Sequence, residues 1–479
     1  MSRRMHVVLL VALGAFVLPL VALAATREDA AGPGFATDVA PVVRDTCAGC
    51  HQLGGIAPFA FRTASDLQRR KAAIEAVLRA KTMPPWPPGS GSPRYVGQEH
   101  RTLTDEERAT VLEWVAAGAK APAASPIGSP KAAAKATRQG ETVRTVAMTT
   151  PYTPAAQSGS TDDYRCFLID PKLTDDAFLT GAQIEPGQAA LVHHVILFRV
   201  RPTEVAAARR KDAASKGPGW TCFGDAGLPS DARGAIQTLG DSSWIAAWAP
   251  GWGGERLPDG VGIPLAAGTQ IVMQVHYNLL NGRQPDRSKA MLTLAPGAAA
   301  LTKVETSLYP APVEVPCAAG ETGALCDRGA AIGDGLRKYG AAGFVPLGLL
   351  YLCGKDVQAP PTGLSSSCDR SFKTPTTIYG VAGHMHLLGQ SITVELNPGT
   401  PSARTLLDIP RWDFHWQTVY TLAEPVKAAA GDVVRVSCTW DTTKRAALTG
   451  PARTPKYLVW GEGTTDEMCL GVLQVTRGG

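Results

Sequence analysis

The stretch Gly383-His384-Met385-His386 sets two histidines two residues apart. On an extended strand this spacing puts both side chains on one face, where they can converge on one ion. Met468 follows His386 by 82 residues, and its thioether completes a set of two imidazoles and one sulfur that suits copper. The stretch therefore predicts a strand of a β-rich domain that carries a copper site.

The other half of the chain repeats this order of ligands. His193-His194 is followed by His276, again 82 residues after His194. Neighbours on a regular strand point to opposite faces, so this pair needs a bulge, a strand end or different ring nitrogens to bind one ion. Taken singly, a histidine pair can be structural, Met468 can belong to a core, and zinc is a rival for the imidazoles. Their joint occurrence at equal intervals favours two copper sites on two similar domains.

Length and composition favour a β-rich chain of several domains. At 479 residues the chain is too long for one core, and its 50 glycines and 37 prolines indicate many turns. Beyond Val143, turn residues alternate with short apolar runs, which is typical of β-sandwiches. We expect two sandwich domains, at residues 143–300 and 301–479. The expected strands lie at residues 189–200, 270–280, 376–381, 391–396, 416–422 and 433–440.

Charge, cysteine content and the N-terminus indicate an exported protein. The net charge of +5 is modest and unclustered, which argues against a nucleic-acid partner, and ten cysteines fit an oxidising compartment. Arg3 and Arg4 precede an apolar run from Val7 to Ala24, so residues 1–24 are interpreted as a signal peptide. An uncleaved anchor is the alternative, because about 18 apolar residues just span a bilayer. We expect a periplasmic or secreted protein without stable membrane insertion after cleavage.

Residues 33–120 contain Cys47-Ala48-Gly49-Cys50-His51, the CxxCH pattern of covalent c-type haem attachment. In this pattern Cys47 and Cys50 bond the porphyrin, and His51 becomes the proximal iron ligand. A redox dithiol or half of a zinc site would not explain the histidine. Met83, on a proline-stiffened loop, is the candidate for the sixth iron ligand.

Helices are expected around this motif. Apolar spacing predicts a helix over residues 66–80, and a capping box at Thr104-Asp105-Glu106-Glu107 opens another that runs to about Ala117. This small all-α unit with one haem resembles a cytochrome c domain. Residues 121–142, rich in Ala, Pro, Ser and Lys, are expected to be a flexible linker that tethers the unit loosely.

Four motifs in order resemble the copper type II, ascorbate-dependent monooxygenase family, which contains dopamine β-hydroxylase and peptidylglycine α-hydroxylating monooxygenase. The motifs are His193-His194-Val195, Gln274-Val275-His276-Tyr277, His384-Met385-His386-Leu387-Leu388-Gly389 and Thr464-Thr465-Asp466-Glu467-Met468-Cys469. Smaller matches are Asp163-Tyr164-Arg165-Cys166, Trp248-Ala249-Pro250-Gly251 and Trp412-Asp413-Phe414-His415-Trp416-Gln417. The resemblance spans roughly residues 143–479.

The resemblance implies two tandem β-sandwich domains whose coppers face a solvent-filled cleft. It implies that His193, His194 and His276 hold a copper that stores and delivers one electron. His384, His386 and Met468 would hold the catalytic copper, which binds O₂ and attacks a substrate C–H bond. Gln274 matches a glutamine that helps to order the region between the coppers.

Two positions depart from the peptide-hydroxylating members of the family. Those members resemble one another in an arginine and a tyrosine that contact the substrate, and here the positions hold Ala382 and Val472. A peptide carboxylate is therefore not the expected substrate, and nothing in the sequence names a replacement.

The resemblance also implies the disulfides Cys166–Cys222 and Cys438–Cys469. Four further cysteines lie in a Gly-rich stretch and allow three pairings, among which the sequence does not choose. These are Cys317, Cys326, Cys353 and Cys368. His415 is interpreted as a packed core histidine rather than a ligand.

These features predict an exported copper monooxygenase with two copper ions and one covalent haem c per chain. The expected partners are a small organic substrate, O₂, and ascorbate or another external one-electron donor. We expect the tethered haem to feed electrons to the copper domains, because a tether raises the effective concentration of donor near acceptor. The alternatives are an exported haem and copper electron carrier or copper-handling protein without a hydroxylated substrate, and an oxidase that releases peroxide.

Overall fold

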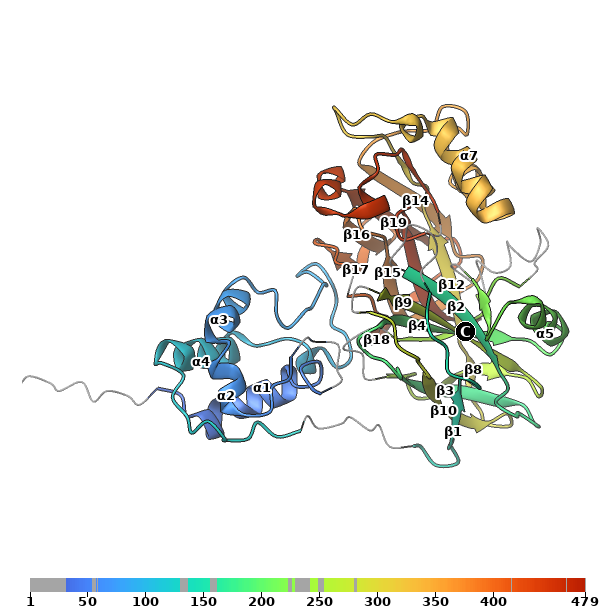
Figure 1. Cartoon of the computed structure of the whole chain (residues 1–479). Coiled ribbons are helices and arrows are strands. Elements are labelled where there is room, and N and C mark those ends of the chain that lie inside the picture. The colour runs from blue at the N-terminus through green and yellow to red at the C-terminus, as the bar shows by residue number, and fades with distance from the viewer. Residues whose placement is uncertain are drawn as a thin grey trace, which may run out of the picture.

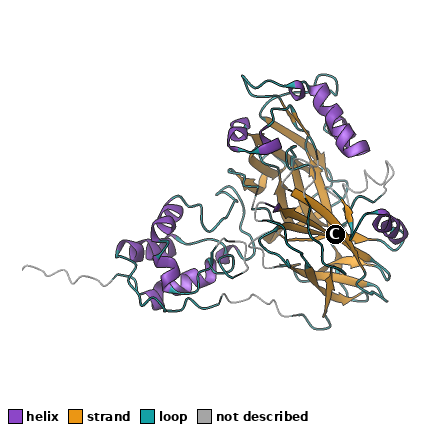
Figure 2. Ribbon diagram, in the orientation of Figure 1, coloured by secondary structure: helices purple, strands orange, loops and turns teal. Residues whose placement is uncertain are grey.

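The structure, a computed structural model, is mainly β, as the sequence predicts. It describes residues 32–53, 57, 59–129, 137–155, 162–222, 226–228, 242–248, 254–279, 282–414, 416–461 and 463–478. A small helical unit lies beside a larger body of strands (Figure 1, Figure 2). The expected signal peptide at residues 1–24, the motif residues 249–251 and His415 lie outside the described residues. Within the described ranges, no helix has both the length and the apolar character needed to cross a bilayer.

The helical unit packs around a core that includes Leu67, Leu78 and Trp114. Its last helix begins at the predicted capping box, where Thr104 Oγ1 accepts from the Glu107 amide at 3.1 Å. The helical segments are η1 (Phe35–Val39), α1 (Ala40–Thr46), α2 (Ala64–Gln68), α3 (Lys71–Arg79), η2 (Gln98–His100) and α4 (Asp105–Ala116).

The single helix predicted over residues 66–80 is two helices, α2 and α3. The Arg70 amide bonds the Leu67 carbonyl at 2.9 Å instead of continuing the α-helical ladder to Asp66. The Asp66 carbonyl accepts from Arg70 Nη1 at 3.3 Å. A side chain thus occupies the acceptor that a continuous helix would offer to its backbone, and the helix ends there.

The expected linker differs at its N-terminal end. Ile127 is buried in the core of the helical unit, and its amide donates to the Arg62 carbonyl at 2.9 Å. The Ser125 carbonyl accepts from the Ala64 amide at 2.9 Å. These backbone bonds make residues 121–128 part of the helical unit, so the connection to the strands is shorter than the predicted span of 121–142.

Residues 142–304 form two sheets that share one core, which is the arrangement of a β-sandwich. The strand orders are β1-β10-β3-β8-β11, with β7 beside β3, and β5-β2-β9-β4-β6. Leu179, Leu197 and Met273 fill the space between them. The elements are β1 (Thr142–Ala147), β2 (Asp162–Ile169), β3 (Ala177–Glu185), β4 (Val192–Val200), α5 (Val205–Ala214), β5 (Trp220–Thr221), β6 (Trp244–Trp248), β7 (Glu255–Arg256), β8 (Val261–Leu265), β9 (Gln270–Asn278), β10 (Lys289–Pro296) and β11 (Thr302–Lys303).

Residues 305–478 form a second pair of sheets around their own core. The strand orders are β12-β21-β15-β18 and β14-β19-β16-β17, with a separate ribbon of β13 and β20. Ile378, Val394 and Leu473 lie in this core. The strands are β12 (Glu305–Pro310), β13 (Glu314–Val315), β14 (Ser365–Ser371), β15 (Thr376–His384), β16 (Gly389–Leu396), β17 (Arg404–Ile409), β18 (Tyr420–Ala428), β19 (Val433–Trp440), β20 (Leu458–Val459) and β21 (Leu470–Arg477).

Four disulfides brace the strand body. Both pairs that the resemblance implied are present, Cys166–Cys222 and Cys438–Cys469. The pairing that the sequence left open is Cys317–Cys326 and Cys353–Cys368. Between β13 and β14 the chain forms η4 (Ala324–Cys326), α7 (Arg328–Tyr339), η5 (Gly340–Phe344) and α8 (Val345–Leu352), and later η6 (Thr442–Ala447) and η7 (Gly450–Arg453).

The helical unit is fastened to the C-terminal sandwich by residues 86–96, which we call the docking segment. Figure 1 shows the chain after α3 running from the helices to the strand body near β17 and β18. The Gly89 amide donates to the Asp408 carbonyl at 2.8 Å, and the Val96 amide donates to the Thr421 carbonyl at 2.8 Å. The unit is therefore docked, which differs from the loose tether expected from the linker composition.

Candidate metal centres

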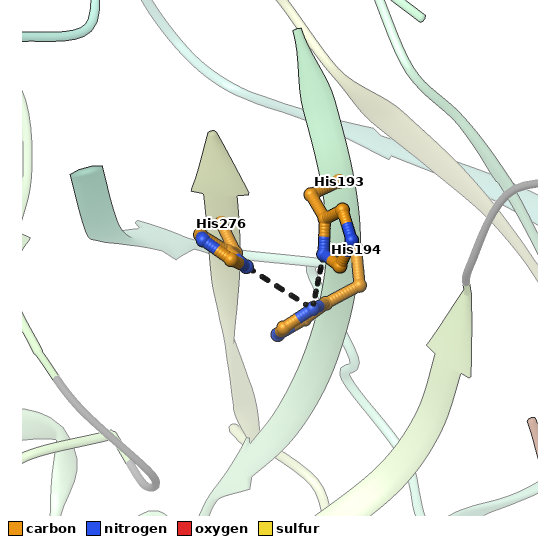
Figure 3. Close-up of side chains that lie close together, drawn as sticks. All are labelled: His193, His194 and His276. Carbon is orange, nitrogen blue, oxygen red and sulfur yellow. Dashed lines mark hydrogen bonds between the residues drawn. The ribbon is translucent and has the colours of Figure 1, made fainter. Parts of the chain in front are cut away.

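The three-histidine set converges at one place on two neighbouring strands. His193 and His194 lie on β4, and His276 lies on β9, directly opposite His194. The register of the two strands shifts between Val192 and His194, so His193 is an extra residue in β4. This irregularity is the kind that the adjacent pair requires, because it turns both rings to one side. Figure 3 shows the three imidazoles facing one another.

The ring atoms of this set have metal-site spacing. His194 Nδ1 lies 3.3 Å from His193 Nδ1 and 3.3 Å from His276 Nδ1, and one nitrogen of each ring lies within 4.8 Å of the others. Burial, and then the neighbouring imidazoles, hold the pKa of His194 well below its usual range. Neutral imidazoles are the form that binds a metal ion.

Two residues on β2 hold His276 in place. Its Nε2 lies 3.0 Å from Asp162 Oδ1, which directs its Nδ1 toward the other two rings. Tyr164 stacks on the other side of the imidazole, with ring centroids 4.0 Å apart and planes 8° from parallel. Gln274, two residues before His276 on β9, is buried, with its Nε2 3.5 Å from Cys222 Sγ. No role was predicted for Asp162 from the sequence. A carboxylate that bonds the second nitrogen of a ligating imidazole is, however, a common feature of metal sites.

The second set lies at the ends of β15 and β21. His384, the last residue of β15, pairs with Leu470, the first residue of β21, so His386 and Met468 lie just beyond the paired ends of these two strands. The rings of His384 and His386 lie 5.1 Å apart, and Met468 is buried in the same core. The structure thus brings the two imidazoles together and sets beside them the segment that carries Met468, 82 residues after His386 in sequence. The role of Met468 as the third ligand stays a prediction.

Hydrogen bonds fix which nitrogen each imidazole offers. His384 Nδ1 lies 2.5 Å from Gln417 Oε1, and His386 Nδ1 lies 3.2 Å from the Asp466 carbonyl. Both acceptors take the Nδ1 proton, which leaves Nε2 of each ring as the ligand atom. Burial lowers the pKa of His384, and it lowers the pKa of His386 to about 3. Both rings are therefore neutral and ready for a metal.

Glu467 ties the two ligand-bearing segments together. Its carboxylate accepts from the amides of His386 at 3.1 Å and Leu388 at 2.7 Å, and from Trp440 Nε1 at 3.0 Å. Burial raises the pKa of this carboxyl to about 7. No role was predicted for Glu467 from the sequence. No local pattern marks it, because polar residues at Thr464, Thr465 and Asp466 precede it.

One aromatic ring contacts both sets. The Phe414 ring lies 5.0 Å from the His193 ring and 6.1 Å from the His386 ring. A second link joins the domains nearby, where the hydroxyls of Tyr164 and Thr464 are 2.8 Å apart. At this point a packed side chain stands between the two sets, whereas the resemblance implied a solvent-filled cleft.

The CxxCH motif follows α1 in the helical unit. Cys47 and Cys50 are the two cysteines of the described residues that form no disulfide. His51 Nδ1 lies 3.2 Å from the Phe59 carbonyl, so this ring too offers Nε2. Burial raises the pKa of Cys47 to about 11 and also raises the pKa of Cys50, which disfavours a reactive dithiol. The donor set fits covalent haem with His51 on the iron.

Met83 lies half-buried on the segment after α3. No contact in the described part of the chain joins Met83 to His51. Its role as the sixth iron ligand therefore stays a prediction.

The two departures from the peptide-hydroxylating pattern are neighbours in space. Ala382 on β15 pairs with Val472 on β21, and both side chains are buried. Ala382 is two residues before His384 on the same strand, so it shares the face of that ligand. The two positions that contact the substrate in peptide-hydroxylating members are therefore adjacent and apolar in this chain.

Comparison with known proteins agrees with this geometry. Residues 154–284 match the N-terminal domain of copper type II ascorbate-dependent monooxygenases, and residues 342–474 match the C-terminal domain. The matched domains cover more than half of the chain, which belongs to the copper type II ascorbate-dependent monooxygenase family. Membership implies copper and ascorbate as cofactors. The matches do not reach the helical unit.

Among individual proteins, the chain is 24% identical over 303 residues to tyramine beta-hydroxylase of Caenorhabditis briggsae. That match covers 60% of this chain and 40% of the relative, so the chain spans about two fifths of its length. Among solved structures, the major capsid protein P2 of bacteriophage PM2 is 8% identical, with 70% of this chain and 97% of that chain covered and a TM-score of 0.23. Allantoicase of Saccharomyces cerevisiae is 9% identical, with 68% and 81% covered and a TM-score of 0.15. Scores this low carry no argument about the fold.

Proposed function

We propose that this protein is an exported, copper-dependent monooxygenase that hydroxylates a C–H bond of a small organic substrate. One observation carries the proposal. The Phe414 ring contacts His193 of one candidate ligand set and His386 of the other, and the two sets differ in composition. One set offers three imidazoles, and the other offers two imidazoles and a thioether. Two sites that both only stored electrons would not need different sets of ligands.

The two sets suit different tasks. His193, His194 and His276 form an all-imidazole set, which accommodates both oxidation states of copper and so suits an electron store. The set of His384, His386 and Met468 favours the reduced ion, because a thioether is a soft ligand. Copper held by these residues would supply the site of O₂ reduction and one of the two electrons.

The balance of the reaction explains why two sites are needed. Hydroxylation of a C–H bond by O₂ consumes two electrons and two protons, and it yields one hydroxyl and one water. An external one-electron donor, ascorbate or another, must therefore deliver two electrons per turnover. Phe414 keeps bulk water out of the contact between the sets, which limits loss of reduced oxygen to solvent.

The substrate is expected to lack a carboxylate at the position that peptides use. The pair Ala382 and Val472 offers no charge or hydrogen bond to such a group, and burying an unpaired carboxylate there would be unfavourable. The relative from Caenorhabditis briggsae is named for tyramine, an amine without a carboxylate. Small aromatic, aliphatic and amine compounds are the classes to screen.

The helical unit is proposed to carry one covalent haem c on Cys47 and Cys50, with His51 and Met83 as iron ligands. It would relay electrons from the external donor to the copper domains. The four disulfides fit export to an oxidising compartment such as the periplasm.

The test is incorporation of labelled oxygen. The purified, copper-loaded protein is supplied with isotopically labelled O₂, a one-electron donor and the compound that stimulates O₂ uptake. We expect one labelled atom in an organic hydroxyl. Absence of any labelled organic product and of label in peroxide would favour an electron carrier or copper-handling protein, and label in peroxide would favour an oxidase.

A matched pair of variants assigns the site. Met468→Leu removes the thioether at nearly constant volume and should abolish incorporation while the haem spectrum is unchanged. Met291→Leu, at a half-buried position on β10, is the control and should retain incorporation. Incorporation retained in Met468→Leu would contradict the assigned role.

A further inference from the structure

The docking segment inserts aromatic side chains into the C-terminal sandwich. Tyr95 is 3% exposed and belongs to the core of that domain, and its hydroxyl donates to the Leu406 carbonyl at 2.8 Å. Its ring lies 5.0 Å from the Tyr420 ring, and the Trp86 ring lies 5.5 Å from Tyr420 in an edge-on contact. We call Trp86, Tyr95 and Tyr420 the interface aromatics.

The docking segment is bonded to the C-terminal sandwich. The hydrogen bonds between residues 89–96 of the docking segment and the strand body run to the C-terminal sandwich. Their donors and acceptors on that sandwich are Leu406, Asp408, Thr421 and Ala423. The three-histidine set lies on the other sandwich.

A charged side chain of the helical unit lies against the docking segment. The guanidinium of Arg101 lies over the Trp86 ring, 5.7 Å from its centroid. Arg101, which directly follows η2 in the helical unit, thus contacts the docking segment at Trp86.

On the other side of the interface, Tyr420 leads to the second ligand set. Tyr420 pairs with Val381 on β15, three residues before His384. Gln417, three residues before Tyr420, has its Oε1 2.5 Å from His384 Nδ1. A path of ring contact, backbone and one short hydrogen bond thus joins Trp86 to a ligand candidate of the proposed catalytic site.

We propose that electrons from the helical unit enter the copper domains at the His384, His386 and Met468 site, through Trp86 and Tyr420. This rests on the proposed haem relay and names its point of entry. In the step, one electron leaves ferrous haem iron, which becomes ferric, and reduces cupric copper to cuprous copper. The external one-electron donor then reduces the haem again, and no bond is formed or broken. The three-histidine site is filled second, from the site beside it, across Phe414.

If the three-histidine site were the first electron acceptor, its copper would be reduced first. In this proposal the copper at the His384, His386 and Met468 site is reduced first. It follows from where the helical unit is fastened, because electron transfer falls steeply with the gap between donor and acceptor. The described contacts of the unit converge on β17 and β18, which flank the second site.

The experiment follows the haem after a pulse of reductant. The full-length protein with haem and cupric copper is held without O₂, and a brief sub-stoichiometric pulse reduces the haem. The loss of ferrous absorbance and the loss of each cupric electron-spin signal are then recorded. We expect a fast, concentration-independent loss of ferrous absorbance that persists in His194→Ala and disappears in His386→Ala.

Substitutions in the docking segment test the route. Trp86→Leu should abolish the fast phase, and Trp86→Phe should restore it because an aromatic ring returns. Tyr351→Leu, which removes an aromatic side chain that is 82% exposed on α8, is the control and should not change the rate. Resistance of residues 86–96 to proteolysis reports in each variant whether the segment stays docked.

The outcomes separate the proposals. A fast phase that survives in Trp86→Leu, or that is lost in His194→Ala and kept in His386→Ala, overturns the entry point and leaves the haem relay standing. No loss of ferrous absorbance in the unaltered protein overturns the relay and the entry point together. Neither result changes the oxygen-incorporation test, which uses an external donor.

Discussion

The phenyl ring of Phe414 stacks on the imidazole of His193, with centroids 5.0 Å apart and planes 18° from parallel. The ring of His386 meets Phe414 edge-on at 6.1 Å. A residue of the C-terminal sandwich is therefore in ring contact with a ligand candidate of the N-terminal one. The Phe414 ring therefore lies between a ligand candidate of each site.

Replacing Phe414 tests what this contact does. Phe414→Leu keeps an apolar side chain but removes the ring, so water gains access between the sites. We expect both coppers to bind as before, with less hydroxylated product and more peroxide per O₂ consumed. The measurement is product and peroxide against O₂ uptake. Unchanged coupling would show that the ring does not exclude water during turnover.

Asp162 is predicted to control affinity at the three-histidine site only. Asp162→Ala frees His276 Nε2 from its carboxylate, so the ring loses its fixed orientation. Loss of such a partner lowers metal affinity about 10- to 100-fold. Copper titration should show one weakened site and one unchanged. Asp162→Asn retains an oxygen acceptor, so its copper affinity at this site should lie between that of the unaltered protein and that of Asp162→Ala. Weakening of both sites would contradict a local effect.

Glu467 is predicted to hold the second site together. In Glu467→Ala the amides of His386 and Leu388 and the indole of Trp440 lose their acceptor, and each buried donor left unpaired costs about 1–3 kcal/mol. We expect a lower midpoint of urea unfolding and loss of the second copper, with the first retained. Electron-spin spectra would count the coppers. Two bound coppers at unchanged affinity would refute this role.

A buried carboxylate on the N-terminal sandwich gives a pH prediction. Burial alone would raise the pKa of Glu141, but bonds from Arg256, Thr180 and Arg138 outweigh it and hold the pKa below its usual value. A lowered folded-state pKa means that the stabilisation is present above about pH 4 and is lost as the pH falls through the folded value. Glu141→Gln should therefore lower stability at pH 7 and flatten the acid limb. The measurement is the urea unfolding midpoint of the unaltered protein and of Glu141→Gln as a function of pH. Parallel curves for the two proteins would contradict this role of Glu141.

Much of the strand body was predictable because its signals are local. The spacing of His384 and His386 predicted a strand, which β15 supplies as far as His384, with His386 two residues beyond its end. The adjacent pair at His193 predicted the irregularity that β4 contains. The family resemblance implied two of the disulfides. Pairing of the other four cysteines was not predictable, because short apolar runs do not say which loops meet.

The supporting residues and the docking could not be predicted, for a different reason. Glu467 matters through three donors brought together by folding, and no local pattern marks it. Tyr95 bonds a carbonyl 311 residues later in the chain. Residues 121–142 have a linker composition, yet Ile127 is buried, because one apolar side chain and a few backbone bonds are enough to hold a polar segment.

The docking segment also imposes an order on biosynthesis. Ser92 Oγ donates to the carbonyl of Asp408, which lies 316 residues later in the chain. The helical unit is synthesised first. The contacts of Trp86 and Tyr95 with the C-terminal sandwich can therefore form only after both sandwiches have been synthesised and have acquired their disulfides. Docking is then among the last steps of maturation. A molecule whose final domain has misfolded keeps these aromatic side chains exposed, where proteases and chaperones can recognise it.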